Sequence, residues 1–182
     1  MKRYIIMMVG KTHSGKTTFA KELEDRVEHA VMIDQDTHAF FLQYQYQKLV
    51  PKTGPHDLKH AITQTIVDYA VKRTDAHLIL SNANLDCSSR KRLLDYYRER
   101  GFVSIIVYFD LPETILRERV ARGNRDTSIL RTVSSFEQVL DRQMRMKKAE
   151  EPAADEADHL FIIRDINDVG QIMAMITNTI QK

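Results

Sequence analysis

Residues 10–17 read Gly10-Lys11-Thr12-His13-Ser14-Gly15-Lys16-Thr17. The spacing fits G-x-x-x-x-G-K-[ST], a glycine-rich loop that holds phosphate groups between a strand and a helix. The flanking residues fit as well, because residues 4–9 form a continuous apolar run that is typical of a strand buried on both faces. After the loop, apolar side chains recur at helical spacing at Phe19, Ala20, Leu23 and Val27. The stretch therefore predicts a phosphate-binding P-loop.

The residue types of this loop suit a triphosphate bound with a metal ion. Gly10 and Gly15 let the backbone turn tightly and approach a ligand, and the amides of residues 13–17 can converge on a phosphate at the positive end of a helix. Lys16 would bridge the β- and γ-phosphates, and the Thr17 hydroxyl would ligate Mg²⁺. The His13 side chain occupies a variable position and receives no role. We therefore predict binding of ATP and Mg²⁺ by Gly10, His13, Ser14, Gly15, Lys16, Thr17 and Thr18.

Composition places few further limits on function. The 182 residues predict one domain spanning residues 1–182, and the net charge of +2 is too small to identify a nucleic-acid-binding protein. The longest apolar stretches fall short of the roughly 18 residues that span a membrane, and the P-loop strand starts too early to leave room for a signal peptide. Cys87 is the single cysteine, which excludes an internal disulfide and favours a reducing compartment. We expect a cytoplasmic protein.

Apolar runs alternate with helical periodicities along the chain. Short apolar runs predict further strands at residues 31–33, 78–80, 103–109 and 160–163. Helical spacing predicts helices at residues 58–71, at 93–97, after Pro112, at 136–146 and at 169–180. This alternation predicts an α/β, three-layer P-loop NTPase fold with a five-stranded parallel sheet and helices on both faces. The polar residues 123–135 interrupt the pattern and are predicted to form an arginine-bearing lid.

Polar residues follow several of the predicted strands. Asp34 and Asp36 follow the second strand, residues 81–84 follow the third, and Asp110 follows the fourth. Ligands of such sheets bind beyond the carboxyl ends of the strands, so we expect these residues to converge on the P-loop. The third strand ends in Ser81, whereas a mechanical or regulatory ATPase usually has an Mg²⁺-binding acid there. That difference favours a kinase, whose transferred phosphoryl group would meet the arginines Arg117, Arg119, Arg122 and Arg125.

At these residues the chain resembles the polynucleotide-kinase-like branch of small P-loop kinases, which includes polynucleotide 5′-kinases and zeta-toxin-like kinases. The resemblance covers nearly the full length and rests on residues 10–17, 34–36, 81–85 with Ser89-Arg90, 109–113 and 116–123. It implies that Asp36 is the general base, and that Arg125 with Arg119 or Arg122 contacts phosphates from the lid. It also implies that Mg²⁺ is held through Thr17, the nucleotide and water.

The identity of the acceptor stays open in the sequence. Polynucleotide kinases of the family often carry an arginine three residues after the base, where this chain has Ala39 after Asp36 or Thr37 after Asp34. A small-molecule or nucleoside-like alcohol lying over residues 36–60 is therefore favoured over a nucleic-acid end. A regulatory ATPase module without an acceptor is the alternative function. The sequence indicates no oligomeric state, and the lack of an Asn-Lys-x-Asp motif favours ATP over GTP.

Several structural roles compete with these functional ones. Asp34 is both the second candidate for the base and a candidate cap of the next helix. The aromatic residues between Phe40 and Tyr46 are predicted to be core, in preference to a platform on which a planar substrate stacks. In the helix predicted at 58–71, the expected apolar stripe is Ile62, Ile66, Tyr69 and Ala70. Asn82 and Asn84 could serve the site or form turns.

Overall fold

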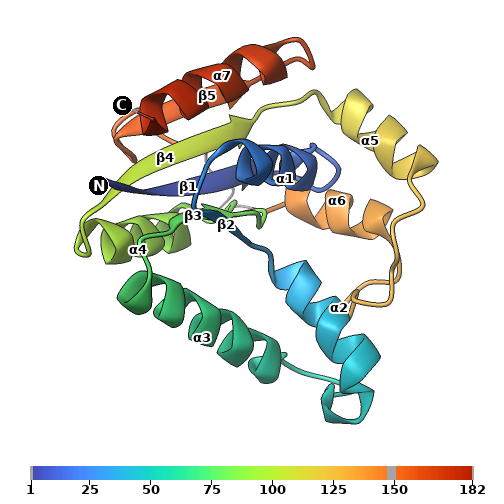
Figure 1. Cartoon of the computed structure of the whole chain (residues 1–182). Coiled ribbons are helices and arrows are strands. Elements are labelled where there is room, and N and C mark those ends of the chain that lie inside the picture. Colours follow the sequence, from blue (N-terminus) through green and yellow to red (C-terminus); the bar gives the residue numbers. More distant parts are fainter. Residues whose placement is uncertain (1, 147–150, 182) are drawn as a thin grey trace.

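The computed structural model describes residues 2–146 and 151–181. In this part of the chain, five parallel strands form one sheet in the order β2-β3-β1-β4-β5. The strands are β1 (Arg3–Gly10), β2 (Ala30–Ile33), β3 (His77–Leu80), β4 (Phe102–Phe109) and β5 (His159–Ile163). Figure 1 shows the sheet at the centre of the molecule. The predicted α/β fold with a five-stranded parallel sheet is confirmed.

Helices cover both faces of the sheet. They are α1 (Lys16–Arg26), α2 (Gln35–Gln45), α3 (Asp57–Arg73), α4 (Cys87–Arg98), α5 (Glu113–Arg122), α6 (Phe136–Met144) and α7 (Asp168–Ile180), with a short 3₁₀ helix η1 (Gln47–Leu49) after α2. Side chains of α1 and α7 pack on one face and side chains of α3 and α4 on the other. Helices α5 and α6 pack against each other beside the carboxyl ends of the strands.

Strand β1 explains why the sheet is buried on both faces. Its side chains alternate between the two cores, with Ile5, Met7 and Val9 facing α3 and α4, and Ile6 and Met8 facing α1 and α7. These five side chains are fully buried, and each contributes roughly 1.5–3 kcal/mol to folding. The continuous apolar run is therefore the expected composition of a central parallel strand.

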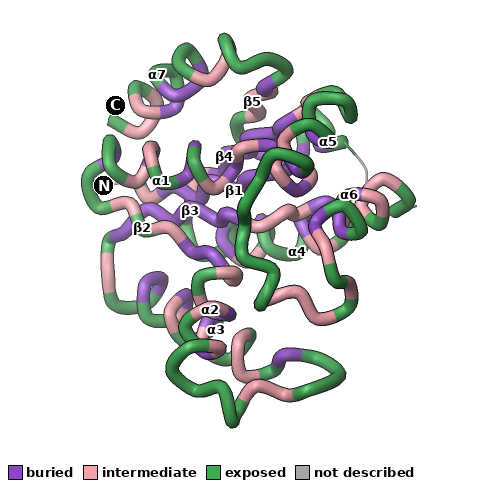
Figure 2. The backbone as a smooth tube through the Cα atoms, turned by 90° about the vertical axis from the view of Figure 1, so that its right-hand side faces the viewer, coloured by how far each residue is buried: buried purple, intermediate pink, exposed green. Residues whose placement is uncertain are grey.

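The order of the strands fixes where a ligand can bind. From β1 at the centre, the chain crosses to β2 and β3 on one side and then to β4 and β5 on the other. The connections after β1 and β4 therefore diverge, which opens a crevice at the carboxyl end of β1. Figure 2 shows the buried strands in the interior and the exposed residues 121–128, which form the end of α5 and the start of the α5–α6 connection. We refer to residues 123–135 as the lid segment.

One prediction about side-chain burial is wrong, and a second is wrong at one residue, Tyr69. Helix α2 buries Ala39 and Leu42, whereas Tyr44 is 68% exposed, because the face of α2 that packs on the rest of the chain carries Ala39 and Leu42 and not the aromatic residues. The aromatic residues of 40–46 are therefore not core. In α3 the buried face consists of Thr63, Val67, Ala70 and Val71, and the predicted stripe residue Tyr69 is exposed. Among the described residues, every helix is too short or too polar to cross a lipid bilayer.

Candidate functional site

The loop between β1 and α1 has the backbone geometry that its glycines allow. Gly10 has φ 152°, and a Cβ atom at this position would lie 2.9 Å from Cβ of Phe109. Gly15 has φ 100° and is the N-cap of α1, so it has no side chain to accept the first amides of the helix. Those amides carry the positive end of the helix dipole and are available to an anion. The loop is therefore built as a phosphate cradle.

Lys16 lies inside this loop and is 8% exposed. Its Nζ donates hydrogen bonds to the carbonyl oxygen of Lys11 at 2.6 Å and to Oγ of Ser14 at 3.1 Å. Burial, and secondarily the charge of Arg125, lowers the pKa of Lys16 to about 7. Because an anion in the loop would stabilise the charged form of the amine, phosphate binding and protonation of Lys16 are coupled.

A cleft of about 1000 Å³ opens over the loop. Its walls come from the loop and α1, the start of α2, Lys59 of α3, the residues after β3, Arg119, the lid segment and α6. The predicted site residues in its lining are His13, Gly15, Lys16, Thr17, Thr18, Asp34, Asp36, Arg119 and Arg125. Among these predicted residues, the cleft brings together side chains that lie up to 112 positions apart in the sequence, from His13 to Arg125.

The two candidate carboxylates have different surroundings. Asp34 is 7% exposed and caps α2, since its Oδ1 accepts a hydrogen bond from the amide of Asp36 at 2.9 Å. Burial raises the pKa of Asp34. Asp36, one residue into α2, is half exposed, and its Oδ2 accepts a hydrogen bond from Nη2 of Arg125 at 2.6 Å. Asp34 therefore has a structural contact within α2, while Asp36 faces the lid segment.

The arginines on α5 and the lid segment reach the site unequally. Arg119 donates from Nη1 to the carbonyl oxygens of His13 and Ser14, both at 3.3 Å. Arg125 stacks over the ring of Phe136, 4.8 Å from its centroid, while pairing with Asp36. Arg122 is exposed and does not line the cleft. The structure therefore does not bring Arg122 to the site.

Residues after β3 supply oxygen atoms beside the loop. The hydroxyl of Ser81 lies 3.4 Å from the hydroxyl of Thr17, and both line the cleft with Asp34. Hydroxyl and carboxylate oxygens are the ligands that Mg²⁺ prefers, so these residues fit that ion. Asn84 has φ 49° and donates to the carbonyl oxygen of Met8 at 2.8 Å, which makes it a turn residue. Asn82 lines the cleft.

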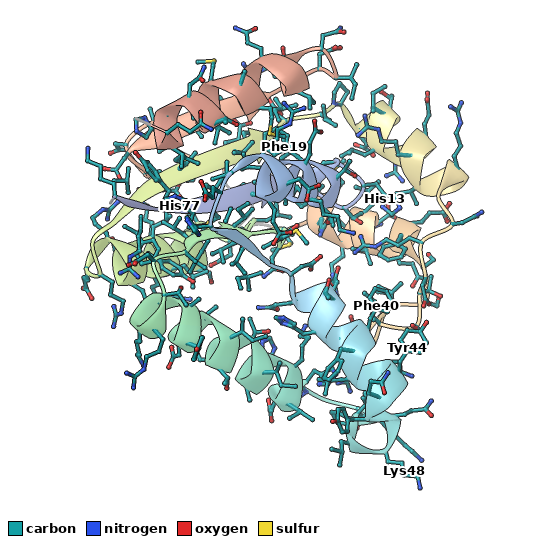
Figure 3. The ribbon with its side chains drawn as sticks, viewed as in Figure 1. His13, Phe19, Phe40, Tyr44, Lys48 and His77 are labelled. Atoms are coloured by element: carbon teal, nitrogen blue, oxygen red, sulfur yellow. The ribbon has the colours of Figure 1, made fainter. Side chains whose placement is uncertain are left out.

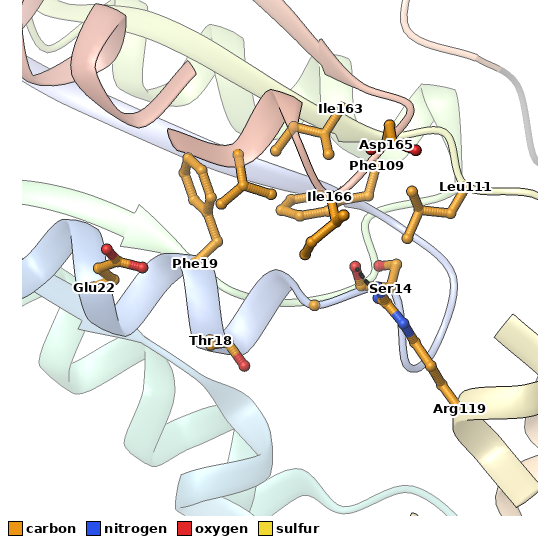
Figure 4. A pocket seen from close by; sticks show the side chains of 12 residues that line it. Ser14, Thr18, Phe19, Glu22, Phe109, Leu111, Arg119, Ile163, Asp165 and Ile166 are labelled. Atoms are coloured by element: carbon orange, nitrogen blue, oxygen red, sulfur yellow. Dashed lines mark hydrogen bonds between the residues drawn. The ribbon is translucent and has the colours of Figure 1, made fainter. Parts of the chain in front are cut away.

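A smaller apolar pocket of about 190 Å³ adjoins the cleft on the other side of Arg119 (Figure 4). Gly15, Thr18 and Arg119 line both cavities. Ser14 also borders the small pocket, whose apolar walls are Phe19, Phe109, Leu111, Ile163, Ile166 and Val169. The predicted convergence of Asp110 is wrong: its carboxylate pairs with Arg164 at 3.3 Å, and it lines neither cavity in the described chain.

Contacts around the P-loop add three site residues that the sequence does not indicate, Gly123, Phe136 and Gln143. The ring of His13, which is labelled in Figure 3, packs edge-on against Phe136 with 5.2 Å between the ring centroids. Its Nε2 lies 3.1 Å from the position that a Cβ atom on Gly123 would occupy. The Thr12 amide donates to Oε1 of Gln143 at 2.7 Å. Helix α6 is predicted by its periodicity, but the docking of its first and last turns on the P-loop depends on contacts between segments far apart in the chain.

Comparison with known proteins assigns a family to this geometry. A family model described as an AAA domain matches residues 5–149. The chain belongs to this AAA domain family. Comparison with curated protein sequences gives no match.

Solved structures resemble this AAA domain over nearly its whole length. A putative kinase from Chloroflexus aurantiacus is 14% identical with a TM-score of 0.65, covering 99% of this chain and 97% of the other. Kti12 from Chaetomium thermophilum, in complex with ADP-AlF3, is 19% identical with a TM-score of 0.62 and coverages of 97% and 98%. The Mycobacterium tuberculosis APS kinase CysC, in complex with AMPPNP and APS, is 12% identical with a TM-score of 0.61 and coverages of 100% and 99%. The AAA domain therefore has the nucleotide-binding P-loop kinase fold, and the predicted likeness to small P-loop kinases is confirmed.

Proposed function

We propose that this AAA domain is an ATP-dependent kinase that transfers the γ-phosphoryl group to the hydroxyl of an acceptor. The observation that carries the proposal is the convergence of Lys16, Asp36 and Arg125 in one cleft over the P-loop. A phosphotransferase needs a phosphate cradle, a carboxylate near the attacking hydroxyl and cationic groups around the transferred phosphate. These three residues and the loop amides provide all of these elements.

In this proposal the nucleotide occupies the two adjoining cavities. The triphosphate lies on the amides of residues 13–17, and the base enters the apolar pocket between Phe109 and Ile166. Arg119 stands at the boundary of the two cavities, where its guanidinium can contact a phosphate on one side and a planar ring on the other. This placement leaves the wider part of the cleft, toward α2 and the lid segment, for the acceptor.

Asp36 is the proposed general base. Its carboxylate accepts the proton of the acceptor hydroxyl while that oxygen forms a bond to the γ-phosphorus and the bond to the β-phosphate oxygen breaks. Asp34 is the weaker candidate, because one of its oxygens already caps α2 and its side chain is buried. The negative charge that develops on the transferred group is met by Lys16, Arg119 and Arg125.

The ion pair between Arg125 and Asp36 defines a resting arrangement in this proposal. A triphosphate offers Arg125 a more highly charged partner than one carboxylate, so binding of ATP moves the arginine from Asp36 to the phosphates. The same movement exposes the Asp36 carboxylate to the acceptor. Mg²⁺ would be held by Thr17, with Ser81 and Asp34 beside it, and when bound it neutralises charge between the β- and γ-phosphates.

An acceptor screen with γ-labelled ATP tests the proposal. Pools of alcohols are incubated with the wild-type protein and with Asp36→Asn, alongside a water-only control. Transfer of label to an alcohol, lost in Asp36→Asn, is the expected result. Hydrolysis that is indifferent to every alcohol and to this substitution would instead identify a regulatory ATPase module.

A further inference from the structure

Two buried nitrogen atoms near the acceptor end of the cleft have no partner. Across the described residues 2–146 and 151–181, the buried side-chain polar atoms without a hydrogen-bond partner are Nδ1 of His56 and Nη1 of Arg131. A buried polar atom without a partner loses its hydration and gains nothing in return, so native proteins rarely leave one empty. Two such atoms from separate segments therefore point to a ligand.

The two residues lie close to each other and to the cleft. Arg131 directly follows Leu130 of the lid segment, and His56, the N-cap of α3, precedes Lys59 in the first turn of that helix by three residues. Leu130 and Lys59 both line the cleft. Arg131 also reaches the segment that carries His56, since its Nη2 donates to the carbonyl oxygen of Pro51, five residues before His56. In agreement with this contact, the pKa of His56 is lowered first by burial and then by the charge of Arg131.

The chemistry of this corner suits an anion. His56 is the N-cap of the 17-residue helix α3 and is 8% exposed, and its side chain does not cap the first amides. The positive end of that helix is thus open, with Lys59 and His60 in its first turn and Asp57 as its exposed acid. Arg131 adds a guanidinium that is already oriented, since its Nη2 donates to the carbonyl oxygen of Pro51 at 2.5 Å.

The whole cleft carries more cationic than anionic side chains in its lining. Six cationic side chains line it against two carboxylates, Asp34 and Asp36; the cations are Lys16, Lys21, Lys59, Arg119, Arg125 and Arg142. In the proposed function, Lys16 and Arg119 contact the nucleotide. Lys59 and the neighbouring Arg131 lie beyond Asp36 on the acceptor side, where the nucleotide provides no phosphate for them.

We propose that the acceptor is an alcohol that also carries a phosphate group, and that Arg131, His56 and the first turn of α3 bind this group. The assignment rests on the kinase function proposed above. Phe40, Ile129 and Leu130 line the cleft and provide apolar contacts for the body of the acceptor. The acceptor hydroxyl then lies at Asp36 while the phosphate is held at the far wall, which fixes the orientation of the molecule.

Inorganic phosphate is the probe for the anion site. The protein is first saturated with Mg²⁺ and AMPPNP, so that the phosphate positions of the P-loop are filled, and phosphate is then titrated at constant ionic strength. NMR signals of the His56 imidazole, assigned with His56→Gln, should shift and saturate.

Arg131→Gln and Lys59→Gln should each weaken phosphate binding about tenfold or more. Arg92→Gln, an exposed arginine on α4, should bind phosphate like the wild type. His56 signals that do not move with phosphate would overturn the proposal.

A second arm compares alcohols that differ by one phosphate group. Nucleosides are paired with nucleoside monophosphates, and sugars with sugar phosphates, and transfer of label from ATP is measured for wild type and Arg131→Gln. A preference in kcat/KM for the phosphorylated member, reduced in the variant through KM, is expected. Equal transfer to both members, unchanged in Arg131→Gln, would overturn the acceptor assignment and leave the kinase proposal standing.

The two arms separate the two proposals. Phosphate binding at His56 without transfer to any alcohol would refute the kinase function and, with it, the acceptor assignment. Lys59 is half exposed and forms no part of the core, so Lys59→Gln gives a clear result even if Arg131→Gln unfolds the protein.

Discussion

Replacing Lys16 by methionine is expected to stabilise the nucleotide-free protein while removing tight nucleotide binding. The amine of Lys16 is buried in the loop, and its pKa falls from 10.5 to about 7 on folding. Each pK unit corresponds to 1.36 kcal/mol, so at pH 7 the buried amine costs about 4 kcal/mol relative to the unfolded chain. Methionine has a similar length and carries no charge.

Part of this gain is offset by lost hydrogen bonds. The Lys16 amine donates to Lys11 and Ser14, and each bond contributes about 1 kcal/mol. We therefore expect Lys16→Met to raise the free energy of unfolding by about 2 kcal/mol at pH 7. For a chain of this size the melting temperature should rise by roughly 4–8 °C.

The dependence on pH has a defined sign. Because folding lowers the pKa of Lys16, the unfolded state binds more protons between pH 7 and pH 10.5, and this group makes the wild type more stable as pH rises. The cost of burying the amine falls to about 2 kcal/mol at pH 9, so the advantage of Lys16→Met should nearly vanish there.

Urea unfolding at pH 7 and pH 9 measures the gain in the free energy of unfolding of Lys16→Met and its decrease with pH. All other titrating groups are shared by wild type and variant, so the difference between them isolates Lys16. The control is Lys91→Met, an exposed lysine on α4, which should stay within about 0.5 kcal/mol of the wild type at both pH values. Added Mg²⁺ and ATP should stabilise the wild type and Lys91→Met but not Lys16→Met. A Lys16→Met protein no more stable than the wild type at pH 7 would refute the argument.

Three further substitutions test separate parts of the structure. Asp36→Asn should lower the rate of phosphoryl transfer by about 10²–10⁴-fold with little change in the Kd for ATP. A fall in ATP affinity as large as the fall in rate would contradict the role of Asp36 as base. Glu156→Ala leaves the fully buried Arg90 without its partner at 2.6 Å and should cost about 3–5 kcal/mol in urea unfolding; a loss below about 1 kcal/mol would show that the pair is dispensable. Gly10→Ala forces a side chain into φ 152° against Phe109, so it should cost about 1–3 kcal/mol and weaken ATP binding, whereas unchanged binding in calorimetry would contradict the loop geometry.

The local features of the fold could be predicted from the sequence. The P-loop spacing and the apolar runs depend on neighbours along the chain, and they indicate all five strands and every α-helix except α2, which lies in the polar, aromatic-rich segment after β2. A common site for Asp36 and Arg125 is also expected, because the resemblance to small P-loop kinases implies that Asp36 is the base and that Arg125 contacts the phosphates. The direct ion pair between these two residues, which lie 89 positions apart in the sequence, could not be predicted.

Contacts between distant segments left no local signal. The buried pair of Arg90 and Glu156 joins α4 to a loop that looks acidic and solvated in the sequence. Exposure of Tyr44 could not be predicted either, because helical spacing does not tell which face of α2 meets the rest of the chain. Tyr44 instead donates its hydroxyl to Asp126 of the lid segment at 2.8 Å.

A crystal structure with Mg²⁺ and a non-hydrolysable ATP analogue tests the central claim most directly. We expect the triphosphate on the amides of residues 13–17, the base in the pocket beside Phe109, and the Arg125 guanidinium on the phosphates with Asp36 released. A triphosphate bound elsewhere, or one bound in the loop with the Arg125–Asp36 pair still intact, would contradict the account.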